Sequence, residues 1–123
     1  MGIDIYIASS MEEPYKRMGL PHVRMEDAMQ EFIWKHQQLW KENIQIYLEL
    51  EPYGDIMLLR EQIKALKRFA EDLLNVDKIT SLECSFHSQY SIDKKEYLTF
   101  AKELYALCQE ALQTKQKLVS LGD

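Results

Sequence analysis

The chain has 123 residues, of which 46% are hydrophobic and 28% are charged, with only four glycines and three prolines. This composition predicts one folded domain over residues 1–123 with a core of its own, and it excludes a disordered chain. The formal net charge of −5 argues against nucleic-acid binding, which needs a basic face. It suits a basic protein partner, although it is also an ordinary charge for a soluble domain.

The first predicted elements rest on the alternation of apolar residues and on the positions of proline and glycine. Residues 3–8 alternate isoleucine with other residues, which predicts a strand with one apolar face. Residues 9–23 contain two prolines and a glycine and are predicted to form a long exposed loop. From about Met25 to Trp40 the apolar residues recur at helical spacing, with acidic residues at the start and basic residues near the end. The helix dipole favours that charge order, so we expect an amphipathic helix there.

Residues 44–51 carry the clearest alternation in the chain. Four aliphatic residues alternate with four polar or aromatic ones: Ile44, Ile46, Leu48 and Leu50 against Gln45, Tyr47, Glu49 and Glu51. This pattern predicts a strand with one buried face and one wet, acidic face. Residues 52–55, Pro-Tyr-Gly-Asp, are predicted to form a turn, because proline lacks a donor and glycine accepts positive φ. The apolar residues 56–59 fit either a short returning strand or the start of the next helix.

The second half of the chain alternates helices and strands. A helix is predicted from Arg60 to Asn75, and a strand over residues 80–88. The last helix is predicted to begin at Asp93, which has capping-box spacing to Glu96, and to run to about residue 115. Residues 117–121 are then predicted to form a short closing strand. These elements predict an α+β fold, with a small, mostly antiparallel sheet packed on one face by two or three amphipathic helices.

Few residues carry a catalytic or metal-binding pattern. Cys84 and His87 have the C-x-x-H spacing of half a metal site, but on a strand they point to opposite faces and no second ligand pair completes them. We therefore expect no metal, and we predict that Cys84 and Cys108 are buried structural thiols. His36 is predicted to be a core-edge histidine. Without a nucleophile elbow or a glycine-rich phosphate loop, we expect no cofactor and no enzymatic activity.

The cellular location of the protein is predicted from patterns that the sequence lacks. Two cysteines are too few for a disulfide framework. There is no secretory signal pattern and no apolar run near the roughly 20 residues that a membrane span needs. We expect a cytoplasmic protein that does not contact membranes.

The candidate partner-binding residues are Tyr47, Glu49, Glu51, Tyr53 and Asp55. On the predicted strand, positions two apart share a face, so the first three residues would lie together. The other two would lie on the turn that follows. Phenol rings among carboxylates offer apolar contact and a hydrogen-bonding group to a cationic protein surface.

Three stretches resemble immunity proteins that bacteria make against polymorphic or contact-dependent toxins. They are the initial Met-Gly-Ile-Asp-Ile-Tyr-Ile, the Glu-Pro-Tyr-Gly-Asp turn that leads into Leu-Leu-Arg-Glu-Gln and a long helix, and Lys-Leu-Val-Ser-Leu-Gly-Asp after a second long helix. Small α+β immunity proteins are similar in this order of elements. The resemblance implies a cytoplasmic, non-enzymatic inhibitor that binds one cognate toxin through acidic and aromatic groups. It implies no particular contact residues.

Two other classes of function stay open. A homo-oligomeric regulatory or structural module would need an apolar seam, for which Trp34, Trp40 and Phe100 are candidates. A small enzyme would need a site assembled from several elements, with His36 or Glu49 as the candidate residues.

Overall fold

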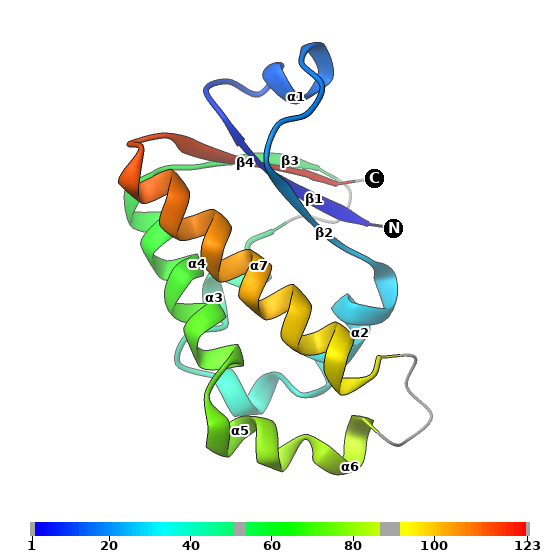
Figure 1. Ribbon diagram of the computed structural model, residues 1–123. Coiled ribbons are helices and arrows are strands. Elements are labelled where there is room, and N and C mark those ends of the chain that lie inside the picture. Colours follow the sequence, from blue (N-terminus) through cyan, green and yellow to red (C-terminus); the bar gives the residue numbers. More distant parts are fainter. Residues whose placement is uncertain (1, 51–53, 87–91, 123) are drawn as a thin grey trace.

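The computed structural model describes residues 2–50, 54–86 and 92–122. Its four strands form one antiparallel sheet in the order β2-β1-β4-β3, with bounds β1 (Ile3–Ala8), β2 (His22–Met25), β3 (Asp55–Leu58) and β4 (Lys117–Gly122). The helices are α1 (Glu13–Lys16), α2 (Asp27–Lys35), the 3-10 helix η1 (Gln37–Trp40), α3 (Gln45–Leu48), α4 (Arg60–Leu73), α5 (Val76–Ser81), α6 (Glu83–Phe86) and α7 (Lys94–Gln113). All of them except α1 lie on one side of the sheet (Figure 1). The predicted α+β class is confirmed.

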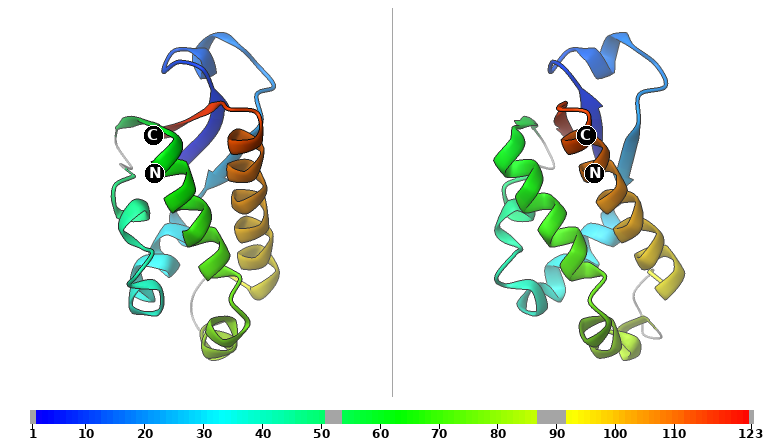
Figure 2. Two further views of the ribbon diagram at one scale, coloured as in Figure 1. Left: turned by 90° about the vertical axis from the view of Figure 1, so that its left-hand side faces the viewer. Right: turned by 60° about the vertical axis from the view of Figure 1, so that its left-hand side comes forward.

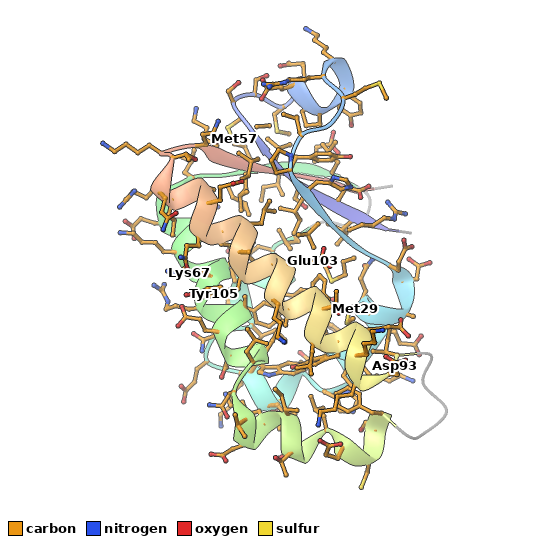
Figure 3. The ribbon with its side chains drawn as sticks, viewed as in Figure 1. Met29, Met57, Lys67, Asp93, Glu103 and Tyr105 are labelled. Atoms are coloured by element: carbon orange, nitrogen blue, oxygen red, sulfur yellow. The ribbon has the colours of Figure 1, made fainter. Side chains whose placement is uncertain are left out.

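Two long helices, α4 and α7, lie side by side and supply much of the core (Figure 2). Each buries a stripe of side chains at helical spacing, among them Ile63, Leu66, Phe69 and Leu73 in α4 and Tyr97, Leu104 and Cys108 in α7. Burying a large apolar side chain contributes about 1.5–3 kcal/mol, whereas an exposed ion pair on a helix contributes a few tenths. The stripes therefore position the helices. Where the two helices meet, the Nζ of Lys67 lies 5.4 Å from the ring centroid of Tyr105 (Figure 3).

The N-terminus of α7 is capped as its sequence predicts. The side chain of Asp93 accepts a hydrogen bond of 2.8 Å from the backbone N–H of Glu96, and both Ile92 and Tyr97 are buried at the same end of the helix. The cap satisfies one of the amides that a helix start leaves without a partner.

We expect Asp93→Ala to lower the free energy of unfolding by about 1 kcal/mol, because this amide then loses its acceptor. Urea denaturation measures the change. Asp93→Asn keeps a side-chain oxygen at the same place and is the matched control, which should retain most of the stability. Equal losses in both variants would contradict the cap as the cause.

The strand predicted over residues 44–51 is wrong, because the described part of this segment is helical. α3 occupies Gln45–Leu48, and Glu49 follows it in a helical conformation. The buried side chains are Ile44, Ile46, Tyr47 and Leu50, while Leu48 is exposed. The buried residues are therefore three or four positions apart, as on a helix, and do not alternate as on a strand. Tyr47 is buried where the alternating pattern predicted that Leu48 would be buried. The predicted turn at residues 52–55 lies largely outside the described residues, and residues 55–58 form β3.

Two further predictions from pattern are corrected. The helix predicted over residues 25–40 is divided: Met25 ends β2, α2 begins at Asp27, and the 3-10 helix η1 follows from Gln37. The strand predicted over residues 80–88 is wrong where the structure describes it, because α5 and α6 occupy this stretch up to Phe86. Cys84 is therefore exposed instead of buried, while Cys108 is buried as predicted. His87 lies outside the described residues.

The predicted loop at residues 9–23 folds over the outer face of the sheet. It contains α1 and runs into β2, and its Leu20 is buried against Ala8, Val119 and Leu121 in a small apolar cluster. The Tyr15 hydroxyl donates a hydrogen bond of 3.1 Å to Asp55 Oδ2 at the start of β3. This segment thus covers part of the face that the long helices leave open (Figure 1).

Candidate binding surface

A groove of about 350 Å³ opens between α2 and α3, and we call it the α2–α3 groove. Its lining consists of Ile3, Gln30, Glu31, Trp34, Tyr47, Leu48 and Leu50. Strand β1 and helices α2 and α3 each contribute to it, so the groove depends on the folded arrangement of all three.

The floor of the groove is fixed by Tyr47. Only 8% of this residue is exposed, its ring stacks on Phe69 of α4 with centroids 5.5 Å apart, and its hydroxyl donates a hydrogen bond of 3.2 Å to the carbonyl oxygen of Gln30. Burial raises the pKa of Tyr47 to about 12. Tyr47 is therefore a neutral, rigid part of the floor, and it does not share a wet face with Glu49 as the predicted strand required.

The walls of the groove carry large apolar side chains that water reaches. Trp34 of α2 is 56% exposed, and Leu48 of α3 is 39% exposed. Their backbones belong to helices whose other faces are buried, since Phe32 and Ile33 of α2 and Ile46 of α3 lie in the core. Exposed aromatic and aliphatic groups around one hollow are typical of a site that another molecule covers.

Carboxylates stand beside these apolar walls. Glu31 lines the groove and lies 3.0 Å from the Nζ of Lys35, in an exposed ion pair of the kind that stabilises little. Glu49 is exposed directly after Leu48. The surface therefore combines an apolar hollow with acidic groups at its margin.

The five sequence-predicted binding residues are not brought together on one strand face. Tyr47 lies in the floor of the groove, Glu49 lies exposed beside it, and Asp55 lies in β3 under the Tyr15 hydroxyl. Glu51 and Tyr53 lie outside the described residues. Trp34 is a candidate for the oligomer seam but is not among the five predicted binding residues. Its place in the sequence, off the apolar stripe of the predicted helix, nevertheless indicates an outward-facing side chain.

His36 is held as a structural residue between α2 and α6. Its Nδ1 lies 2.7 Å from the carbonyl oxygen of Phe32, which only accepts, so Nδ1 carries the proton. Its Nε2 lies within hydrogen-bonding distance of the Ser85 hydroxyl, at 2.8 Å, and the centroid of its ring lies 4.4 Å from that of Phe32. Nδ1 thus binds the last turn of α2 and Nε2 joins that helix to α6, so both ring nitrogens are engaged, as is typical of a core-edge histidine.

The cysteines and the described acidic residues do not form a cluster that could hold a metal ion. Burial raises the pKa of the Cys108 thiol to about 12, an effect that the Lys67 charge partly opposes, so this thiol stays protonated and unreactive. Within residues 2–50, 54–86 and 92–122, no group of three or more His, Cys, Asp or Glu side chains is placed to hold a metal ion. In the same part of the chain, no helix combines the length and the apolar character needed to cross a membrane.

Comparison with known proteins gives one structural likeness. No protein-family model matches the chain, and no curated protein matches it in sequence. Among solved structures, a Neisseria DNA mimic protein, DMP12, is similar to it with a TM-score of 0.54 and 13% sequence identity, over 98% of this chain and 99% of that chain. At this identity the likeness shows a shared fold over nearly the whole length of both chains.

Proposed function

We propose that this chain is a non-enzymatic binding protein that captures, in the cytoplasm, a partner protein with a basic surface. The observation that carries the proposal is the α2–α3 groove, where Trp34 and Leu48 are exposed around a hollow that Glu31 also lines. The exposed Glu49 follows Leu48 directly in the chain. Tryptophan is among the residues most enriched at the energetic centres of protein interfaces. An apolar side chain of the partner would fill the hollow while its cations meet the carboxylates.

Charge supports the choice of a basic partner. The chain carries a net charge of −5, which speeds the approach of a cationic protein and slows that of an anionic one. Glu31 and Glu49 would then fix the orientation of the partner more than they strengthen the contact, because charges at an interface rim contribute little affinity.

Two lines of comparison support the same chemistry for the partner. The sequence resembles immunity proteins, whose partner is a toxin, and the fold is similar to that of a protein named as a DNA mimic. A toxin domain that acts on nucleic acid and a DNA-binding protein both present a basic surface to phosphates. We therefore propose a partner whose nucleic-acid-binding surface is the part that this chain covers, with an immunity role against a nuclease-like toxin as one form of it.

Capture of the partner tests this proposal. The immobilised wild-type protein is expected to retain one basic protein from an extract of the cells that encode it, and to release it as salt is raised. We expect Trp34→Ala, and separately the double variant Glu31→Lys, Glu49→Lys, to reduce retention at least tenfold, because each removes one half of the proposed contact.

The controls separate the groove from charge in general. Glu110→Lys changes an exposed carboxylate near the far end of α7 and should leave capture unchanged. The purified partner should also lose bound DNA when this chain is added. Retention by the groove variants equal to that of the wild type, or a captured partner that is acidic, would contradict the proposal.

A further inference from the structure

A second hollow lies on the other side of α2, between β2 and α7. We call it the β2–α7 groove. It measures about 450 Å³ and is lined by Val23, Arg24, Glu26, Met29, Ile92, Lys95, Glu96, Thr99, Phe100 and Glu103. Figure 3 labels Met29 and Glu103, which belong to its α2 and α7 sides. None of these residues lines the α2–α3 groove, so the two hollows are separate sites.

The groove has an apolar floor and a strand along one side. Val23, Met29 and Phe100 form part of the floor and are each at least nine-tenths buried. β2 is an edge strand, since the sheet order β2-β1-β4-β3 places it at one end of the sheet. An edge strand that faces a helix across an apolar groove is the arrangement into which an extended peptide inserts as an added strand. The four residues of β2 give such a strand about 13 Å of length to pair with.

The charges around the groove favour a basic occupant. Arg24 is held by Asp4 at 2.6 Å and by Glu26 at 2.7 Å, so its positive charge is already neutralised. Glu96 and Glu103 are exposed on α7, seven residues apart, and neither forms an ion pair with a described residue. Lys95 is the cation that α7 adds to the lining. The rim is thus net acidic, and a second copy of this chain, which also carries −5, would be repelled.

We propose that the β2–α7 groove binds an extended segment of a protein by strand addition to β2, and that this segment carries an apolar residue flanked by basic residues two positions away on each side. Side chains two apart on a strand share a face, so the apolar group enters the floor while both cations point toward α7. Seven helical residues span about 10.5 Å, and four strand residues span about 13 Å, so flexible lysines at both ends reach Glu96 and Glu103.

A synthetic peptide provides the test. The probe Ser-Lys-Thr-Val-Thr-Lys-Ser, with blocked ends, is titrated into isotope-labelled protein and followed by NMR amide shifts. We expect shifts confined to β2, the start of α2 and the first half of α7. The same peptide with glutamate in place of both lysines should bind at least tenfold more weakly, because it would place carboxylates against Glu96 and Glu103.

One variant blocks the groove without touching the core. Thr99 lines the groove and is exposed, so Thr99→Arg places a large cation there on a helix that tolerates arginine well. We expect at least tenfold weaker binding of the lysine peptide. The matched control, Gln113→Arg, adds the same charge at the far end of α7 and should leave binding within twofold. Trp34→Ala should also leave it unchanged, which separates this site from the α2–α3 groove.

Backbone pairing is tested through the peptide itself. In an extended strand the backbone amides of alternate residues point to opposite sides, so only every second amide of the peptide would face β2. N-methylation of the amides that face β2 should abolish binding, whereas N-methylation of the other amides should not. Equal effects of both sets would exclude strand addition. Equal binding of the lysine and glutamate peptides would exclude an acidic recognition site. If sedimentation shows a dimer that Thr99→Arg dissociates, the groove is filled by a second copy and the proposal is overturned.

Discussion

Replacing Trp40 by alanine should lower the free energy of unfolding by about 3–5 kcal/mol, among the largest effects of a single substitution in this chain. Trp40 has no exposed surface, and its ring lies 6.2 Å from that of Phe69 and 6.5 Å from that of Tyr97. It therefore joins η1 to both long helices. Its removal leaves a cavity that these rigid helices cannot close. Urea denaturation followed by circular dichroism measures the loss.

Trp34→Ala is the matched control, since it makes the same change at a tryptophan that is 56% exposed. We expect it to change the free energy of unfolding by less than about 0.5 kcal/mol. Trp40→Phe is a second control, because a smaller ring keeps part of the packing and should cost less than alanine. Equal losses for Trp34→Ala and Trp40→Ala would contradict the division into a core tryptophan and a surface tryptophan.

This division corrects the apolar seam expected for an oligomer. Of its three candidates, Trp40 lies in the core and Phe100 is largely buried in the floor of the β2–α7 groove. Of the three, only Trp34 is exposed. A seam made of all three residues is therefore wrong, because Trp40 has no exposed surface and Phe100 has very little.

The elements that sequence predicted well are those with long or reinforced patterns. Both α4 and α7 repeat their apolar spacing over several turns, and Asp93 marks the start of α7 by an independent capping signal. β1 and β4 are short, but each pairs with the other in the middle of the sheet. For these elements local preference and tertiary packing favour the same structure.

The elements that sequence missed are short segments whose apolar residues fit two periods. Leu82 and Phe86 are four apart, which places them on one face of a helix and equally on one face of a strand. The two structures differ in where they place Cys84, which a strand would bury together with Leu82 and Phe86 and which the helix leaves exposed. The type of residue does not decide between them, because a cysteine is common both inside and at the margin of a core. In residues 44–51 the deciding residue was Tyr47, whose ring packs on Phe69 from a distant helix. Tertiary contact of that kind is invisible to a local pattern.

The surface beside Glu49 is built differently from the strand face that the sequence predicted. An acidic surface with aromatic groups is present near Glu49, but its exposed aromatic is Trp34 of α2, and Tyr47 forms the floor beneath. The two residues are brought together because the Tyr47 hydroxyl binds the carbonyl oxygen of Gln30, one turn before Trp34. Helix α2 thereby separates two hollows, with Trp34 facing one and Met29 facing the other. A partner that contacts both would cover the exposed ridge of α2.

Raising the pH from about 10 to about 12 should unfold the protein. Burial raises the pKa of Tyr47 and of Cys108 to about 12 each, and burial together with the Asp72 carboxylate raises the pKa of Tyr97 further. In the unfolded chain these groups lose their protons near their ordinary values, at about pH 8.5 to 10. The folded state therefore holds more protons than the unfolded state from about pH 8.5, where the thiol of the unfolded chain begins to titrate, up to about pH 12. The contribution of these groups to stability is complete below that range and falls as the pH rises through it, most steeply above about pH 10, where the tyrosines of the unfolded chain also titrate. Each group lowers the free energy of unfolding by roughly 1 kcal/mol per pH unit. The three groups together therefore remove several kcal/mol from a free energy of unfolding that is typically about 5–15 kcal/mol.

Urea denaturation at several alkaline pH values measures this fall, with tyrosinate absorbance recorded on the same samples. Tyr47→Phe removes one titrating group and should flatten the dependence, although at neutral pH it loses stability because the Gln30 carbonyl loses the hydrogen bond from the phenol. The two stability curves should therefore converge as the pH rises. Cys108→Ala should flatten the curve at its lower end, where the thiol of the unfolded chain titrates first. A free energy of unfolding that stays constant up to about pH 12 would mean that these side chains are open to water, and the core built around α4 and α7 would have to be redrawn.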